Sequence, residues 1–417
     1  GSYLTGADYN VFMGTYAGYQ TVDVDKAVII GYQAGYSNMT SAVDGTIAIG
    51  YQAGYGITSG ASNTIIGYDA GKTLTSGADN VIIGRDAGND TNGSKAVIIG
   101  SYAADDNSPT NAVVIGYAAG RVINGENTTA VGYNALKVAT EPDNTAVGAY
   151  SLQALVDGEN NTALGIAAGY RIVKGDDSTF LGWYAGFNAT GSDNTFVGSE
   201  AGKGGQGSAP YSSGTNNTAL GYQALTAFTV GDHTTAIGYQ AGKAQVDSYD
   251  NTYIGARSGQ ANAVGDGNVT LGDRALYSDT SGHRTIAIGK DALHFFSGSG
   301  TTAYNSDITK IIAIGYFAGY NMGSVPGGSW PQATRSTNNI VIGYYAGNTH
   351  YAGGSNVVIG TEALKGIGNH TQASVYIGES SGQNVASGSY NVAVGAYTGR
   401  HATGSYNTFM GYKAGVG

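Results

Sequence analysis

The sequence repeats one short pattern of apolar and polar positions from end to end. A typical copy is residues 63–71, Asn-Thr-Ile-Ile-Gly-Tyr-Asp-Ala-Gly, and we take the first glycine of each copy as its anchor. There are 23 anchors, nearly all 16 to 19 residues apart, with three longer intervals of 23, 26 and 28 residues. A fixed period of this length predicts a solenoid, in which each coil buries its apolar side chains only by stacking on its neighbours.

Positions are counted from the anchor, so that position −1 is the residue before it. Position −1 is Ile, Val, Leu or Met in every copy, and position −3 is Val, Ile or Thr in every copy. Branched and aliphatic residues at alternate positions are typical of a strand with one packed face. We therefore expect positions −3 and −1, the threonines included, to point into the coil.

Position −2 lies on the opposite face of the same strand, and it is apolar in every copy except Thr270. A strand that is apolar on both faces is buried on both faces. The second face predicts an apolar stripe along the stack, which a soluble monomer does not leave open to water. This favours a parallel homo-oligomer with cyclic symmetry over a flattened solenoid that folds the stripe inward.

Glycine recurs at three offsets: the anchor itself, position +4 and position −7. It predicts corners where the backbone has positive φ or approaches its neighbour closely. We expect each coil to hold two or three short strands between these corners, and asparagines at position −4 to form ladders. The fold predicted is an all-β parallel β-solenoid of about 23 coils with a period of 16–17 residues, continuous over residues 1–417. Its expected glycine spine includes Gly31, Gly67, Gly148, Gly238, Gly343 and Gly411.

The composition argues against several classes of function. The chain of 417 residues has a net charge of −10, which argues against nucleic acid and against an anionic membrane surface as partners. It has no cysteine, so disulfides and thiolate metal sites are excluded. Glycine is abundant at 70 residues whereas proline is rare at 5, which argues against collagen and against disorder. The sequence has no apolar run long enough to span a bilayer.

Residue types that carry chemistry are present without a catalytic pattern. The six histidines have no metal-ligand spacing, so we expect them on solvated loops or coil surfaces. Acidic pairs such as Asp105-Asp106 and Asp176-Asp177 fall in expected turns, where aspartate is common. They do not indicate the cleft with two opposed carboxylates that a glycosidase needs. We expect no enzyme activity, no cofactor and no metal. Tyrosine follows the anchor in ten copies, which predicts either ring packing between coils or a surface for sugars.

The three long intervals are the best candidates for recognition, because loops that leave a rigid scaffold often bind ligands. They place insertions at residues 203–214, 297–310 and 320–338. Long loops are also tolerated without any function, because closing them costs little. The candidate recognition residues in or beside them are Tyr211, Phe295, Phe296, Tyr320 and Trp330.

Three runs carry a resemblance to a known family. Residues 144–148, 217–225 and 235–242 resemble the head repeats of YadA-like trimeric autotransporter adhesins and the related repeats of phage tail fibres. The resemblance implies a left-handed parallel β-roll, intertwined or side by side in a homotrimer, outside the cell on a cell or virion surface. The coil here is longer than in the adhesin heads, and no heptad stalk or anchor strands are found.

These observations predict an extracellular structural and adhesive fibre that attaches to a host receptor, a glycan or another surface. One alternative is a self-assembling filament subunit that stacks end to end, and another is a carbohydrate-active β-solenoid. The sequence starts at Gly1 without methionine and stops mid-repeat after Gly411, from which we expect a piece of a longer fibre or a filament subunit.

Overall fold

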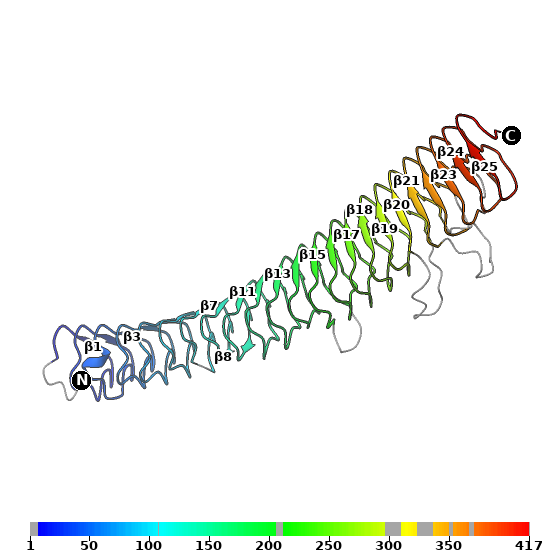
Figure 1. Cartoon of the computed structure of the whole chain (residues 1–417). Helices are drawn as coiled ribbons and strands as arrows, with labels where there is room; N and C mark the ends of the chain where they lie inside the picture. Colours follow the sequence, from blue (N-terminus) through cyan, green and yellow to red (C-terminus); the bar gives the residue numbers. More distant parts are fainter. Residues whose placement is uncertain are drawn as a thin grey trace. The chain divides into compact units, whose positions relative to one another are not determined.

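A computed structural model describes residues 7–106, 108–205, 212–296, 310–322, 337–349, 353–366 and 371–416. The chain divides into two compact units, Gly1–Val197 and Gly198–Gly417, and each is described by itself. Most of the residues in the three predicted insertions lie outside the described ranges. Figure 1 shows that both units consist of stacked coils with the strands side by side along one face.

The first unit carries one short strand per coil in a parallel sheet, and each strand pairs with the equivalent strand of the next coil. For example, Thr145, Ala146 and Val147 pair with Thr162, Ala163 and Leu164. The strands of this sheet are β1 Val11–Met13, β2 Val28–Ile30, β3 Ile47–Ile49, β4 Thr64–Ile66, β5 Val81–Ile83, β6 Val97–Ile99, β7 Val113–Ile115, β9 Thr129–Val131, β11 Thr145–Val147, β12 Thr162–Leu164, β13 Thr179–Leu181 and β14 Thr195–Val197.

The second unit repeats this arrangement. Its strands are β15 Thr218–Leu220, β16 Thr235–Ile237, β17 Thr252–Ile254, β18 Val269–Leu271, β19 Ile286–Ile288, β20 Ile312–Ile314, β21 Ile340–Ile342, β22 Val357–Ile359, β23 Val375–Ile377, β24 Val392–Val394 and β25 Thr408–Met410. The described residues contain 23 strands of this kind, one before each anchor glycine. The prediction of an all-β parallel β-solenoid is confirmed.

The expectation of two or three strands per coil is wrong for most coils. Besides the main strands, the described residues hold the short pair β8 Val122–Ile123 and β10 Val138–Ala139, on another side of the coil from β7 (Figure 1), the 3-10 turn η1 Ser41–Val43, and isolated bridge residues at Ala189, Ser212 and Ser387. Positive-φ residues recur at positions −5, 0, +2 and +4, as at Asp143, Gly148, Tyr150 and Leu152. These dihedrals interrupt extended backbone, so the rest of the coil consists of turns that still donate hydrogen bonds to the coils on either side.

The side-chain orientation of the strands is the reverse of the expected one. Position −2 fills the coil interior: Ile29, Ala146 and Phe180 are completely buried. Positions −3 and −1, such as Thr145 and Val147, are only partly buried on the outer face. The physical reason is the size of the interior, which admits one side chain per strand, and the cost of burying a threonine hydroxyl without a partner.

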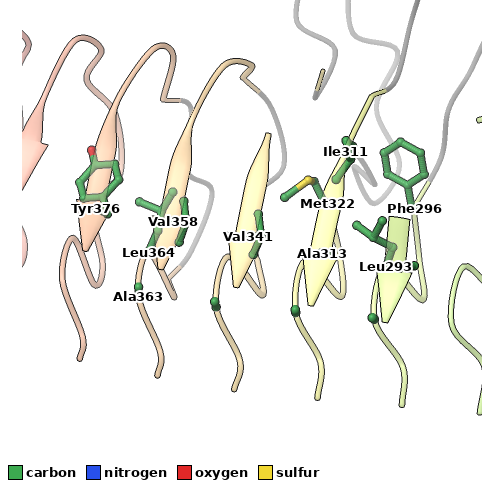
Figure 2. Close-up of a cluster of buried hydrophobic side chains, with 14 of the residues drawn as sticks. Leu293, Phe296, Ile311, Ala313, Met322, Val341, Val358, Ala363, Leu364 and Tyr376 are labelled. Atoms are coloured by element: carbon green, nitrogen blue, oxygen red, sulfur yellow. The ribbon is translucent and has the colours of Figure 1, made fainter. Parts of the chain in front are cut away.

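Figure 2 shows how the interior of the second unit is filled. Val341 and Val358 point inward from adjacent strands, and the row of buried side chains continues through Met322 and Ile311 to Phe296. Small residues at position +3, such as Ala363 in the turn after β22, are fully buried as well. The core is therefore a narrow apolar column in which each coil contributes a few side chains.

The anchor glycine is required by space as well as by its dihedral angle. Gly148 has φ +130°, and a Cβ there would lie 2.5 Å from the carbonyl oxygen of Gly165 in the next coil. Gly238 has the same relation to Gly255, at φ +136° and 2.5 Å. The other predicted spine glycines also have positive φ: Gly31, Gly67, Gly343 and Gly411, although a Cβ added at Gly411 would meet no atom within 4 Å. A positive φ and, except at Gly411, a close neighbour both favour glycine at these anchors.

The asparagine ladder at position −4 exists, and it runs through the backbone. The Asn63 amide oxygen accepts from the Asn80 backbone N–H at 3.0 Å, and its amide nitrogen donates to the Gly77 carbonyl at 2.8 Å. Direct amide-to-amide contacts are rarer; Asn356 donates to Asn339 at 3.1 Å. Asn63 thus satisfies one donor and one acceptor of the neighbouring coil. Among the described residues, no helix has the length and apolar character needed to cross a bilayer.

Candidate functional site

Two of the predicted recognition residues meet in the second unit. The rings of Phe295 and Tyr320 lie edge to face, with centroids 5.1 Å apart, and the Phe295 N–H donates to the Tyr320 carbonyl at 2.8 Å. Phe295 is exposed over 42% of its surface. Along the chain, each ring lies at or just before the start of one of the long insertions, at 297–310 and 320–338. The pair therefore marks the coil surface from which both insertions start.

His294 occupies the centre of this surface. Its ring is stacked between Tyr277, at a centroid distance of 4.7 Å, and Tyr320, at 5.1 Å. Only 7% of His294 is exposed, so the expectation of a solvated histidine is wrong at this position. The reason is a column at position +5, where an aromatic residue recurs in many coils and the rings stack from coil to coil. Histidine replaces tyrosine in this column and keeps the stacking.

A buried carboxylate lies beside the imidazole of His294. Asp291 is 1% exposed, and its Oδ1 lies 2.8 Å from His294 Nδ1 and 2.9 Å from Arg274 Nε. Arg274 also donates from Nη2 to Asp291 Oδ2 at 3.0 Å. Burial lowers the pKa of His294, an effect that the charge of Asp291 opposes. Burial also raises the pKa of Tyr320. The ring plane of His294 is held by its stacking between Tyr277 and Tyr320, with Asp291 close to its Nδ1.

We call this set the root cluster: Arg274, Asp291, His294, Phe295 and Tyr320. It combines fixed aromatic rings with one buried ion pair, and it joins the coils anchored at Gly272, Gly289 and Gly315. Chemically it is suited to hold the starts of two insertions in a defined geometry, since both carboxylate oxygens of Asp291 face a cationic or donor group. It supplies aromatic surface, chiefly through Phe295, for contact with a ligand.

The other predicted recognition residues do not join the cluster at the surface. Phe296 is 2% exposed and packs into the coil interior with Leu293 and Met322, so its assignment to recognition is wrong. Of the two neighbouring rings, Phe295 takes the outward position and Phe296 the inward one. Trp330 and Tyr211 lie outside the described residues.

Tyrosines at position +1 form a second column on the coil surface. Tyr32, Tyr51 and Tyr68 stack with centroids 5.4 and 4.9 Å apart and ring planes within 13° of parallel. Between stacked neighbours the faces of the rings are covered, and the edges point to solvent. The inter-coil ring packing predicted from sequence is confirmed for these tyrosines. A sugar would need an open ring face, which the interior of such a column does not offer.

Acidic residues in the described part of the chain include members of turns and ion pairs. Arg121 Nε lies 3.4 Å from Asp106 and 3.8 Å from Asp105, and burial is the main cause that raises the pKa of Asp105. Within the described ranges no group of three or more histidine, aspartate or glutamate side chains is placed to hold a metal ion. The expectation of no enzyme activity and no cofactor stays a prediction.

The sequence reasoning missed Arg274, Asp291 and His294. One signal was available: His294 stands at position +5, where a column of aromatic residues identifies an inter-coil stack. The members of that column include Tyr19, Tyr36, Tyr55, Tyr170, Phe187, Tyr277 and Tyr320. The partnership of Asp291 with Arg274 spans 17 residues, one coil, and no local pattern marks it.

No protein-family model matches the chain, and no curated protein sequence matches it.

Proposed function

We propose that the chain is an extracellular structural and adhesive fibre subunit, which assembles with parallel copies of itself and attaches to a host or another surface. The repeat architecture supports a structural role. One short sequence, repeated many times, gives a stiff stack of coils that hydrogen-bond to each other through their backbones. The resemblance of the repeats to trimeric adhesin heads and tail fibres favours three copies.

One observation carries this proposal: the outer face of the sheet is apolar along both units. Leu164 and Leu181 in the first unit are 47% and 40% exposed, and Leu220 in the second is 45% exposed. They stand at position −1, where every copy carries Ile, Val, Leu or Met. A continuous row of partly exposed apolar side chains on a sheet is an interaction surface. A parallel copy covers it best, because the same row repeats at the same spacing on each chain.

The outward threonines at position −3 bear on a second function. An array of outward threonines is what an ice-binding face needs, and Thr129, Thr145 and Thr162 do stand on the outer face. However, position −3 is Val or Ile in many other coils, and position −1 has no threonine at all. Position −1, which is apolar in every coil, favours packing of this outer face against protein. Antifreeze activity of the purified chain would contradict this choice.

Attachment is assigned to the surface around the root cluster, since two insertions start there from rigid coils. Phe295 offers an exposed ring whose position is fixed by its contact with Tyr320. A rigid aromatic side chain at the base of loops is a common feature of recognition surfaces, because little conformational entropy is lost when it is covered.

The self-association is tested by replacing the outer row with charge. Leu164→Lys combined with Leu181→Lys places two cations in the proposed interface, where burial without partners is costly. The expected result is a shift to monomer, measured by light scattering on the purified chain and by electron microscopy of fibres. The matched control is Val173→Lys, because Val173 is similarly exposed, at 39%, and lies in a turn away from the sheet.

A wild-type chain that is monomeric at all concentrations would contradict the proposal. Unchanged assembly of the double variant, with both variants folded by circular dichroism, would contradict the assignment of the outer sheet face to the interface. Adhesion is tested separately with Phe295→Ala. We expect this variant to assemble as the parent does and to attach more weakly to the host or other target surface.

A further inference from the structure

The first unit contains a depression that the proposed assembly does not use. It has a volume of about 450 Å³ and lies over the coils anchored at Gly100, Gly116 and Gly132. This volume is within the ~300–1,000 Å³ typical of small-ligand sites. We propose that it binds a carboxylate-bearing sugar residue, an inference that rests on the proposed attachment function and names a ligand class for it.

A break in the surface columns creates the depression. Position +2 carries tyrosine in the coils on either side, at Tyr102 and Tyr150, whereas the two coils between them have Ala118 and Asn134. Ala118 is 5% exposed and Asn134 is 9% exposed, so together they form the floor. Two successive coils without a large side chain at this position leave space for one ring-sized group.

Tyrosine rings line one side of the depression. Tyr117 and Tyr133 stack with centroids 5.4 Å apart, and Tyr102 meets Tyr117 edge to face at 5.8 Å. The column at position +1 ends at Tyr117, because Ser101 takes that position in the preceding coil, and the ring plane of Tyr102 is turned by 81° from that of Tyr117. Aromatic surface next to an open space suits the apolar C–H face of a sugar ring.

Two basic residues also line the depression. They are Arg121 and Lys137, which occupy position +5 in neighbouring coils. Arg121 is oriented by ion pairs from its Nε to Asp105 and Asp106. Lys137, by contrast, has no ion pair and no side-chain hydrogen bond with any residue that the structure describes. An ammonium group beside an open depression, in a chain of net charge −10, predicts an anionic group on the ligand.

The floor adds a polar group that selects for hydroxyls. The Asn134 backbone N–H donates to the Tyr117 carbonyl at 3.0 Å, which fixes the residue in place. Within the described ranges its side-chain amide makes no hydrogen bond, so it can both donate to and accept from a ligand. A carboxylate near Lys137, hydroxyls near Asn134 and a C–H face on the tyrosines together describe an acidic sugar residue better than a simple anion.

The repeat itself supplies a blocking substitution. Tyrosine at position +2 occurs with positive φ in other coils, at Tyr102 and Tyr150, and Ala118 has the same kind of backbone at φ 50°. Ala118→Tyr therefore restores the aromatic column and fills the depression with little strain. Ala167→Tyr is the matched control, because Ala167 also stands at position +2 in the first unit, with φ 54° and 4% exposure, outside the depression.

The test is isothermal titration of the full chain with tri-galacturonate, with galactotriose as the neutral counterpart and with sodium acetate. We expect tri-galacturonate to bind at least tenfold more tightly than either. Lys137→Gln should weaken it about tenfold or more, as loss of a charge-assisted contact does, and Ala118→Tyr should weaken it at least as much by filling the depression. Ala167→Tyr and Lys95→Gln, which removes an exposed cation elsewhere, should bind as the parent does.

Equal binding of the neutral trisaccharide or of acetate would overturn the proposal, as would unchanged binding of Lys137→Gln, a variant whose fold is not at risk. Absence of any titration signal would overturn it too. The outcomes for the proposed function are separate: a chain that binds tri-galacturonate but forms no fibres contradicts the fibre and leaves this site standing. Fibres that assemble and adhere but ignore tri-galacturonate contradict the site alone.

Discussion

The side-chain amide of Asn144 donates to the backbone carbonyl of Gly158, one coil further along, at 2.7 Å. The same asparagine accepts from the backbone N–H of Asn161 at 3.0 Å. One buried side chain thereby completes the hydrogen bonding of two backbone groups at a corner where strand pairing is not possible. The repetition of this bond from coil to coil explains why asparagine recurs at position −4.

Asn144→Ala should lower the free energy of unfolding by about 1–3 kcal/mol, because a donor and an acceptor of the backbone lose their buried partners. The measurement is denaturant unfolding, with amide hydrogen exchange to show whether opening is local to the coils around Gly148. Asn124→Ala, at an exposed asparagine, serves as control and should change stability by less than about 0.5 kcal/mol. Equal effects of the two substitutions would refute a structural role for the ladder.

Gly148→Ala should be more damaging than Gly411→Ala. Both glycines have positive φ, +130° and +108°, so both substitutions introduce backbone strain of about 1–3 kcal/mol. Only at Gly148 would the new Cβ also collide with the next coil, at the Gly165 carbonyl. Comparison of the two melting temperatures separates strain from collision. If the two variants melted alike, close coil-to-coil contact would not be the reason for the glycine anchor.

Thr270 is the one polar residue at position −2, and it is paired inside the coil. Its hydroxyl contacts the Ser258 hydroxyl, and both residues are completely buried. Thr270→Val alone should destabilise the second unit by about 1–3 kcal/mol, since the Ser258 hydroxyl loses its partner. Combining it with Ser258→Ala should restore most of that loss. A double-mutant cycle with additive effects would show that the two hydroxyls do not depend on each other.

Stability of the second unit should fall as the pH drops below about 6.5. Burial holds the folded-state pKa of His294 below the ordinary value of 6.5, so the unfolded chain binds the proton first as the pH falls. The loss grows between pH 6.5 and the lower folded pKa, and it is absent above this window. His294→Phe keeps an aromatic ring between Tyr277 and Tyr320 and should reduce the pH dependence.

The check is the urea midpoint of the parent and of His294→Phe at about pH 5 and about pH 7.5, on either side of the ordinary histidine pKa. His233→Phe is the control, since the His233 side chain is 62% exposed and should leave the pH dependence as it was. The same slope in parent and His294→Phe would mean that other groups, and not His294, set the acid sensitivity.

The period, the strand positions and the glycine anchors could all be predicted from the sequence. These features depend on the backbone: a positive φ at Gly148 or Gly238 disfavours other residue types, and the restriction recurs once per coil. Hydrogen bonding between equivalent residues then follows, because coils of equal length stack in phase. The stacking of Tyr32, Tyr51 and Tyr68 is a consequence of the same register.

Which face of each strand turns inward could not be predicted, because positions −3, −2 and −1 are nearly all apolar or threonine. Alternation identifies two faces but does not say which is the core when both are apolar. The tertiary structure decides it through volume: the narrow interior admits Ala146 or Phe180 from one side, and leaves Thr145 and Val147 outside. The same holds for the root cluster and for the depression at Ala118 and Lys137, where side chains from several coils meet. Local sequence contains the backbone requirements of a coil, whereas contacts across coils depend on the sizes of side chains that lie a full repeat or more apart.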